Sequence, residues 1–279
     1  MISRRAAITS SAAAVLGAGS WPCLSQPPTR AAAGRERKKG LGQSMKHASW
    51  AERLRELRCG WFYSWGPTVP PDLPPGIEFV PMIYRHGGDA GAIAHAVGAA
   101  KQSGIRELLG FNEPDAATQG NMSVAACLDA WPALMDTGMR LGSPSCVHPD
   151  RDWMIEFMAE VEKRGLRVDF VCVHSYGGPS ADALVSRLEK IHRMFRRPLW
   201  ITEFAVGDWE AKSVDQHRHS PNTVLRFMER VLPMLDRLDY IERYAWFPAK
   251  VTSVPLGTSA LFDAGGNLTR LGECYRDHA

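Results

Sequence analysis

The sequence of 279 residues has few cysteines and lacks the common metal-binding patterns. None of its six cysteines is spaced as Cys-x-x-Cys, the pairing that structural zinc sites usually show, and no His-Glu-x-x-His pattern is present. Setting aside Cys23 leaves an odd number of cysteines, from which no disulfide can be identified. Cys59 and Cys172 lie in apolar runs and are expected to be buried thiols. We therefore expect neither a metal site nor a cofactor.

Excess charge of one sign is also missing. The formal net charge is only +3, and residues 1–50 contain eight basic residues against a single acid, Glu36. Residues 51–279 therefore hold 25 basic and 29 acidic residues, a net charge of −4. Nucleic-acid binding needs basic residues clustered on one face, so no nucleic-acid partner is expected.

No apolar run is long enough for a membrane-spanning helix. The run Ala6–Gly19 is short and rich in Ala, Ser and Thr, and it follows Ser3-Arg4-Arg5. Paired arginines before such a run are typical of a bacterial twin-arginine export signal, so we predict export to the periplasm or the exterior. The alternative is an ordinary disordered N-terminus. Ser20-Trp21-Pro22 before Cys23 is a poor lipoprotein motif, so a lipid anchor is not expected.

The remaining boundaries follow from composition. Ala31-Ala32-Ala33 could satisfy a small-x-small cleavage rule, so residues 1–33 are predicted to be a twin-arginine-type signal peptide. Residues 34–50 belong to a stretch rich in Pro, Ala, Gly, Arg and Lys, which is typical of a linker. Residues 51–279 show no break in composition and are predicted to form one domain.

Beyond residue 50, short apolar runs alternate with longer segments of helical period, as in an α/β fold built from β-α units. The strand-like runs are Cys59–Trp65, Glu78–Tyr84, Glu107–Phe111, Arg140–Ser143, Asp169–His174, Leu199–Phe204 and Ile241–Phe247. The helix-like segments are Ile93–Ser103, Val124–Thr137, Trp153–Arg164, Ala181–Arg193 and Thr223–Arg237. We predict a single (β/α)8 TIM-type barrel, with a short or degenerate second strand inside the proline-rich segment 66–77.

An open doubly wound sheet shows the same alternation, but it usually carries a glycine-rich phosphate-binding turn after its first strand. Here the first strand-like run ends in Tyr63-Ser64-Trp65-Gly66-Pro67, which cannot hold a phosphate in that way. The barrel is therefore favoured.

Two glutamates occupy positions where barrel enzymes place their active sites. Glu113 follows the fourth strand and Glu203 ends the seventh, so both are expected at the C-terminal mouth on roughly opposite sides. Either glutamate alone could be a surface or helix-capping carboxylate. A facing pair is what glycosidic bond cleavage needs, because one carboxyl protonates the leaving oxygen while the other attacks the anomeric carbon.

Six short blocks near the strand ends are distinctive. They are Gly60-Trp61-Phe62-Tyr63-Ser64-Trp65, Phe79-Val80-Pro81-Met82, Leu109-Gly110-Phe111-Asn112-Glu113-Pro114, Val173-His174-Ser175-Tyr176, Trp200-Ile201-Thr202-Glu203-Phe204 and Tyr244-Ala245-Trp246-Phe247. In this order, over about residues 56–275, they resemble glycoside hydrolase family 128, a clan A family of retaining glycosidases whose characterised members act on β-1,3-glucans. Where the family often has Trp-Gly after the second block, this chain has Ile83-Tyr84-Arg85-His86.

The resemblance implies a role for each matching residue. It implies that Glu113 is the acid/base and Glu203 the nucleophile. Asn112 would bond the sugar 2-hydroxyl, a contact that can strengthen as the oxocarbenium-like transition state forms. His174 and Tyr176, at the end of the sixth strand, would lie near Glu203 and orient it. His174 could instead be a core histidine bonded to the backbone.

Tryptophan is frequent, and indole rings pack well against the apolar faces of β-linked glucose. The predicted sugar platforms are Trp65, Trp246 and Trp209, with Tyr63 as a further substrate-binding residue. Tryptophans inside periodic segments are assigned to the core, namely Trp61, Trp131 and Trp200. Trp153 could belong to either group.

Together these features predict an exported, monomeric glycoside hydrolase that cleaves β-1,3-glucan, endo-acting and retaining, without metal or cofactor. Asp115, Asp208 and Glu210 would make the mouth negative, which suits a neutral polysaccharide. Two alternatives stay open: a glycan-binding or sensing protein on the same barrel, and a glucanase for another β-linkage.

Overall fold

The computed structural model describes residues 38–85 and 90–278. In these residues eight parallel strands are separated by helices, except that the second and third strands follow each other without one. The predicted signal peptide and Cys23 lie outside the described residues. The chain divides into residues 1–32 and a second unit, residues 33–279, to which all described residues belong. Within the described ranges, no helix is both long enough and apolar enough to cross a membrane.

The elements have the following bounds. The strands are β1 (Lys39–Gly42), β2 (Trp61–Tyr63), β3 (Glu78–Phe79), β4 (Glu107–Leu108), β5 (Arg140–Leu141), β6 (Val171–Ser175), β7 (Leu199–Phe204) and β8 (Ile241–Trp246). The α-helices are α1 (Trp50–Glu56), α2 (Ala90–Gln102), α3 (Val124–Met135), α4 (Asp152–Lys163), α5 (Ala181–Phe195), α6 (Pro221–Arg237) and α7 (Arg270–Asp277). Two short 3-10 helices are η2 (Val214–Gln216) and η3 (Gly257–Ser259).

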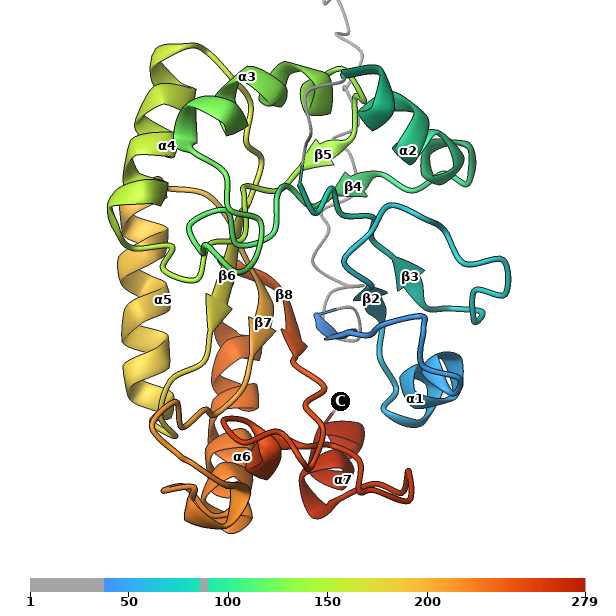
Figure 1. The fold of residues 1–279 in the computed structure, drawn as a ribbon, viewed down its shortest axis with the longest axis vertical. Coiled ribbons are helices and arrows are strands. Elements are labelled where there is room, and N and C mark those ends of the chain that lie inside the picture. The colour runs from blue at the N-terminus through green and yellow to red at the C-terminus, as the bar shows by residue number, and fades with distance from the viewer. Residues whose placement is uncertain (1–37, 86–89, 279) are drawn as a thin grey trace, which may run out of the picture. The chain divides into compact units, whose positions relative to one another are not determined.

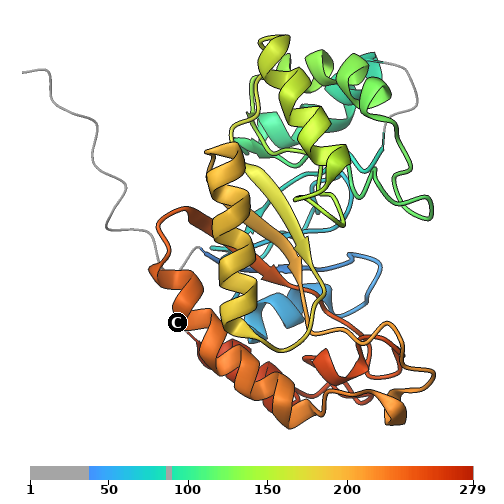
Figure 2. The same ribbon diagram turned by 90° about the vertical axis from the view of Figure 1, so that its left-hand side faces the viewer.

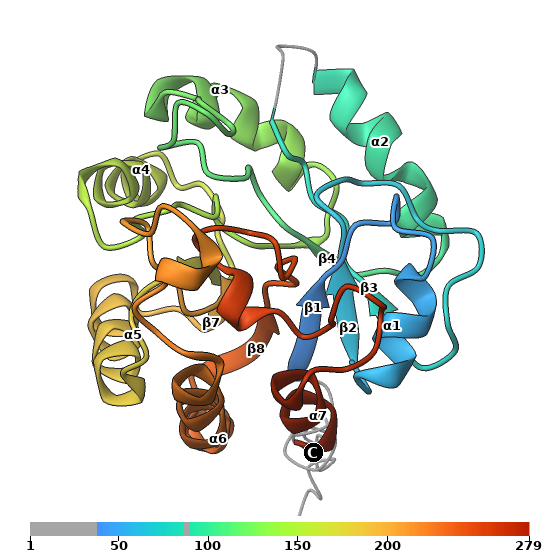
Figure 3. The same cartoon turned by 60° about the horizontal axis from the view of Figure 1, so that its bottom comes forward.

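The strands form a barrel-like ring (Figure 1). Six of them pair in the order β3-β2-β1-β8-β7-β6, and β4 pairs with β5 in a second sheet. Isolated parallel bridges link the two sheets, from Met82 to Leu109 on one side and from Gly142 to Phe170 on the other. Figure 3 shows the helices around the outside of the strands, and Figure 2 shows α5 in front of β6 and β7.

The predicted α/β architecture is confirmed for most of the chain. Each of the seven strand-like runs overlaps one of the strands β2 to β8, and each helix-like segment overlaps one of the helices α2 to α6. These elements carry strong apolar patterns, because one face of each packs into a shared core. The short helices α1 and α7 were not predicted.

The eighth strand does not lie where the sequence placed it. Segment 66–77 contains no strand, and the missing member is β1, inside the predicted linker 34–50. The second strand in chain order, β2, is short, as was expected of a second strand. It corresponds, however, to the run Cys59–Trp65, which was expected to be the first strand. The prediction of a strand in segment 66–77 is therefore wrong, and so is the prediction of a linker for residues 39–50. β1 reads Lys-Gly-Leu-Gly, with one large apolar side chain, so it carries no strand signal of its own.

Contacts with distant residues hold β1 in place. Lys39 is buried, and its ammonium group donates hydrogen bonds to the carbonyl oxygens of Tyr275 (2.8 Å), Arg276 (3.1 Å) and His278 at the end of α7. A cation is favoured there, because the helix dipole is negative at its C-terminus. The C-terminal end of α7 therefore stabilises the position of β1.

Gly40 offers a test of how tightly β1 is packed. A Cβ at this position would overlap the indole ring of Trp61. We expect Gly40→Ala to lower the free energy of unfolding by about 1–3 kcal/mol, measured by urea denaturation. The matched control is Gly98→Ala in α2, where a Cβ meets no atom within 4 Å. Alanine there should add about 0.5–1 kcal/mol, so equal stability of the two variants would contradict the packing argument.

Aromatic side chains fill the interior of the ring. Trp61 and Trp200 belong to this interior cluster, and Trp131 packs between α3 and α4 against Phe157. All three tryptophans are fully buried, which confirms their assignment to the core. The guanidinium of Arg243 lies 4.3 Å from the ring centroid of Trp200 and donates a hydrogen bond to Glu78 at 2.7 Å. These contacts link β3, β7 and β8 through the buried side chain of Arg243.

All five described cysteines are free. Cys59 and Cys172 are buried as predicted, and burial raises the pKa of each thiol to about 12. Both therefore stay protonated and act as small apolar side chains.

Candidate active site

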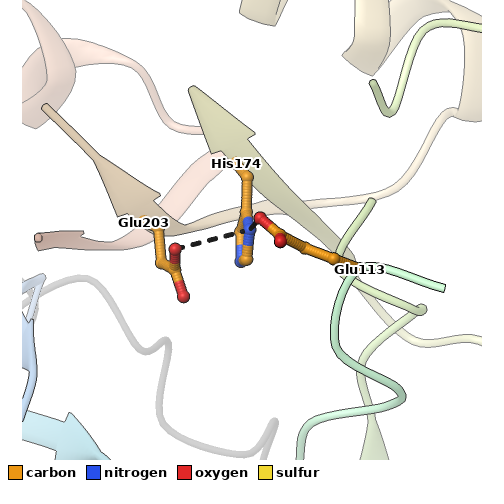
Figure 4. A group of neighbouring side chains, drawn as sticks. All are labelled: Glu113, His174 and Glu203. Atoms are coloured by element: carbon orange, nitrogen blue, oxygen red, sulfur yellow. Dashed lines mark hydrogen bonds and ion pairs between the residues drawn. The ribbon is translucent and has the colours of Figure 1, made fainter. Parts of the chain in front are cut away.

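The C-terminal ends of β4, β6 and β7 bring Glu113, His174 and Glu203 together (Figure 4). Nδ1 of His174 lies 2.8 Å from Oε1 of Glu113 and 3.5 Å from Oε2 of Glu203. One oxygen of each carboxylate and a ring nitrogen of the histidine all lie within 4.8 Å of one another. The two glutamates singled out in the sequence thus face each other across a buried imidazole.

Three side chains donate hydrogen bonds to Glu203, which is 4% exposed. The Tyr63 hydroxyl and the Trp65 indole N–H both bond Oε1 at 2.7 Å, and the Tyr176 hydroxyl bonds Oε2. Burial, and after it the charge of Glu203, raises the pKa of both tyrosines well above the usual range, so the phenols remain donors. This arrangement suits an ionised carboxylate, which can only accept hydrogen bonds.

Glu113 is held in an unusual backbone conformation. Its φ is 38°, in the left-handed region, which costs a non-glycine residue about 1–3 kcal/mol. Its N–H donates to the Ser145 carbonyl at 2.9 Å, and Met122 N–H donates to the Pro114 carbonyl at 3.0 Å. A Cβ at Gly120 would overlap the Asn112 carbonyl oxygen, so this glycine lets the loop fold back on itself. The loop thereby fixes the direction in which the Glu113 side chain points.

His174 lies closer to Glu113 than to Glu203, although the sequence predicted that it orients Glu203. Burial alone would lower the pKa of His174, but the charges of Glu203 and Glu113, with the hydrogen bond to Glu113, outweigh burial and raise it. Its contacts are with the two carboxylates and not with a backbone carbonyl, as a core histidine would make.

In the described part of the chain, these three residues also form the one group of His, Cys, Asp or Glu close enough to hold a metal ion. Their oxygens already have protein partners, since Glu203 accepts hydrogen bonds from three side chains and Glu113 is hydrogen-bonded to His174. We therefore assign the cluster to acid–base and nucleophilic chemistry.

Comparison with known proteins identifies the family. A family model for the glycosyl hydrolase catalytic core matches residues 41–275. The crystal structure of a glycoside hydrolase family 128 (subgroup I) endo-β-1,3-glucanase from Amycolatopsis mediterranei, a variant in complex with laminarihexaose, is 34% identical with a TM-score of 0.76. The similarity covers 87% of this chain and 99% of that one. The chain belongs to glycoside hydrolase family 128.

Two further family relatives agree. A subgroup II endo-β-1,3-glucanase from Sorangium cellulosum is 26% identical with a TM-score of 0.69, over 87% of this chain and 98% of that one. Alkali-sensitive linkage protein 1 of Schizosaccharomyces pombe is 30% identical over 224 residues, or 77% of this chain. The chain spans only 39% of that relative's length. The family resemblance read from the sequence is confirmed.

Two buried amides at the mouth of this family 128 barrel have an oxygen without a partner. Oδ1 of Asn112, which precedes Glu113, and Oε1 of Gln43, which follows β1, accept no hydrogen bond, and both residues are 3% exposed. Asn112 was a predicted site residue. Gln43 was missed, because the strand before it carries no sequence signal.

Two of the predicted sugar platforms contact Glu203 or one of its hydrogen-bond donors. Trp65 adopts a φ of 54°, which turns its indole N–H toward Glu203. Trp209 is 63% exposed, and its N–H donates to the Tyr176 carbonyl at 3.1 Å. Its ring meets Tyr176 edge to face, with 6.0 Å between the centroids.

The prediction that Trp246 is a sugar platform is wrong. Its side chain is fully buried between the strands and the surrounding helices, and its indole N–H donates to the Ser259 carbonyl at 2.9 Å. Successive residues of a strand point to opposite faces, so the next residue, Phe247, turns toward the mouth. The Phe247 ring lies 6.0 Å from Trp65 and 5.5 Å from Tyr176, between centroids. Trp153, left open by the sequence, is half-buried and stacks on Phe157.

The three acidic residues expected to make the mouth negative have partners. Asp115 accepts two hydrogen bonds of 3.0 Å from backbone N–H groups of the loop after β5. Arg218 pairs with Asp208 at 2.7 Å and with Glu210 at 3.3 Å. The hydrogen bonds from Arg218 hold the pKa of Asp208 well below its usual range. These carboxylates therefore shape loops and add little unpaired charge.

Proposed function

We propose that this protein hydrolyses β-1,3-glucan at internal linkages by a retaining double displacement. The observation that carries the proposal is the Glu113 and Glu203 pair, whose oxygens approach within 4.8 Å around His174. Retaining glycosidases hold the two carboxyls about 5–5.5 Å apart, whereas inverting enzymes need about 6.5–9.5 Å. The endo-β-1,3-glucanases of the same family support the choice of substrate.

In the first step, Glu203 attacks the anomeric carbon while Glu113 passes its proton to the glycosidic oxygen. The leaving chain departs as an alcohol, and a glycosyl ester of Glu203 forms. With its proton on Nδ1, His174 donates to Oε1 of Glu113, which leaves Oε2 to carry the proton that is transferred. His174 is thus a positioning residue for the acid.

In the second step, water attacks the anomeric carbon of the glycosyl ester. Glu113, now a carboxylate, takes a proton from the water, and the bond to Glu203 breaks. Both carboxyls return to their starting states. The unpartnered Oδ1 of Asn112 is available to the sugar 2-hydroxyl during both steps.

We also propose that residues 1–33 direct export, because Arg4 and Arg5 precede an apolar run. A fusion of residues 1–33 to a reporter protein, with Arg4 and Arg5 replaced by Lys in a second copy, tests this part separately.

The products formed from a series of β-1,3-glucan oligosaccharides test linkage, mode of attack and stereochemistry together. We expect fragments of intermediate length, with the β-anomer first by NMR, and much slower release from β-1,4- and β-1,6-glucans. Initial α-anomer would contradict the retaining mechanism, and single units released from one end would contradict endo action. Binding of the same oligosaccharides without any release would favour the glycan-binding alternative.

A further inference from the structure

A cavity of about 440 Å³ opens next to the catalytic pair. It lies between the segment after β1, helix α1, and the loops after β8, and Figure 3 shows the chain between β8 and α7 passing beside β1. Trp65 and Phe247 form one wall. The indole N–H of Trp65 donates to Glu203, so one wall residue of the cavity is in direct contact with the proposed nucleophile.

Arg53, on α1, is a charged residue of this cavity whose guanidinium N–H groups bond no protein acceptor in the described part of the chain. Its guanidinium carbon lies 4.4 Å from the ring centroid of Phe262, and its side chain makes no hydrogen bond or ion pair with any described residue. Arg55 on the same helix, by contrast, pairs with Glu52 at 3.4 Å. Burial lowers the pKa of Arg53, and the charge of Glu56 on the same helix offsets this only in part. The guanidinium N–H groups therefore remain available to a ligand in the cavity.

The charge around the cavity is positive. His47 and Lys250 line it together with Arg53, and burial followed by the charges of these two residues lowers the pKa of His47. Asp263 is the single acidic residue of the lining, and its carboxylate accepts hydrogen bonds from the backbone N–H of Asn267 at 2.9 Å and from the Asn267 side chain. The cavity therefore favours an anion.

The same cavity has features suited to a sugar ring. Gln43 lines it, donates from Nε2 to the Ser44 carbonyl at 3.0 Å, and leaves the buried Oε1 without a partner. A sugar hydroxyl can donate to this oxygen. The rings of Trp65 and Phe247 offer apolar surface to the face of a sugar. A small inorganic anion would leave these groups unused.

We propose that this cavity binds a unit of the glucan chain that carries an anionic group, either a carboxylate or a sulfate or phosphate ester. Arg53 and Lys250 neutralise the anion, Gln43 accepts a hydrogen bond from a sugar hydroxyl, and Trp65 and Phe247 contact the ring. The inference rests on the proposed function, since it places the modified unit in the same chain that Glu203 attacks. The substrate then carries some negative charge, whereas the sequence predicted a neutral polysaccharide.

The test compares neutral β-1,3-glucan oligosaccharides with two modified sets of the same length. In one set some primary hydroxyls are oxidised to carboxylates, and in the other they are sulfated. For each set, kcat/KM is measured by reducing-end release, and binding by calorimetry to the Glu113→Gln protein. We expect at least one anionic set to be favoured over the neutral set by about tenfold at low salt, equivalent to about 1.4 kcal/mol.

Arg53→Gln should abolish this preference, and the matched control Arg55→Gln should keep it. Preference for carboxylate alone identifies a uronic-type unit, whereas preference for both sets identifies any oxyanion. Equal kcat/KM and equal binding of neutral and anionic chains by the unmodified protein would overturn the inference, as would an equal effect of Arg53→Gln on all three sets. If no chain is hydrolysed, the proposed function fails, and the calorimetric preference still decides the role of the cavity.

Discussion

Glu203→Ala abolishes the release of reducing ends from β-1,3-glucan, with an expected loss in kcat of about 10⁴-fold or more. The substitution removes the atom that attacks the anomeric carbon, so no glycosyl ester can form. It also leaves the donors on Tyr63, Trp65 and Tyr176 without their acceptor. No neighbouring group replaces the carboxylate, because Glu113 approaches from the other side of His174.

Two readouts separate loss of the nucleophile from loss of the fold. A 2-deoxy-2-fluoro glycoside that traps the ester should add its mass to the unmodified protein and not to the variant, while the thermal unfolding midpoint shows whether the variant is folded. Glu210→Ala is the matched control, because Glu210 is an exposed carboxylate on the loop after β7 and pairs only with Arg218. Hydrolysis by folded Glu203→Ala within tenfold of the unmodified rate would refute the assignment.

Glu113→Gln is expected to lower kcat for β-1,3-glucan by about 10²–10⁴-fold, the usual contribution of a general acid. The amide keeps the shape of the side chain and an oxygen that can accept from His174, but it has no proton to transfer. The loss should therefore depend on the leaving group. An aryl glycoside that departs without protonation should form the glycosyl ester at nearly the unmodified rate, measured as a burst of released phenol.

Comparing the glucan with the aryl glycoside distinguishes loss of the acid from a general distortion of the site. A variant that merely distorts the site would lose activity toward glucan and aryl glycoside alike, and that result would contradict the role of Glu113 as the acid. Glu156→Gln, an exposed carboxylate on α4, serves as the control and should change neither rate.

The positions of Glu113 and Glu203 at the mouth were predictable because strong strand signals lead directly to them. The run Leu199–Phe204 is apolar enough to identify β7, and Glu203 interrupts it near the end, where a barrel presents side chains to a ligand. Glu113 follows β4 in the same way. Their contacts could not be predicted, because the hydrogen bond from Trp65 depends on a left-handed backbone conformation that no sequence pattern specifies.

Errors arose where structure depends on distant parts of the chain. β1 exists because Trp61, Tyr275 and the strand β8 surround it, so its own four residues did not reveal it, and Gln43 was missed with it. Trp246 was assigned by its position at the end of a strand. Its orientation depends on which residues of β8 point inward, and this is decided by register with β7 and β1.

The seam between β1 and β8 also has a kinetic consequence. Lys39 pairs with Tyr244, so the ring closes only after nearly the whole domain has been synthesised. Closing so long a loop costs entropy before the contacts of β1 can repay it, and contacts between residues far apart in sequence slow folding. Until closure, the unpaired edges of β1 and β8 remain open to other chains. Pairing of the glycine-rich strand β1 with β8 is therefore the step that closes the barrel. The rate of this step limits the time during which a newly made chain is prone to aggregate.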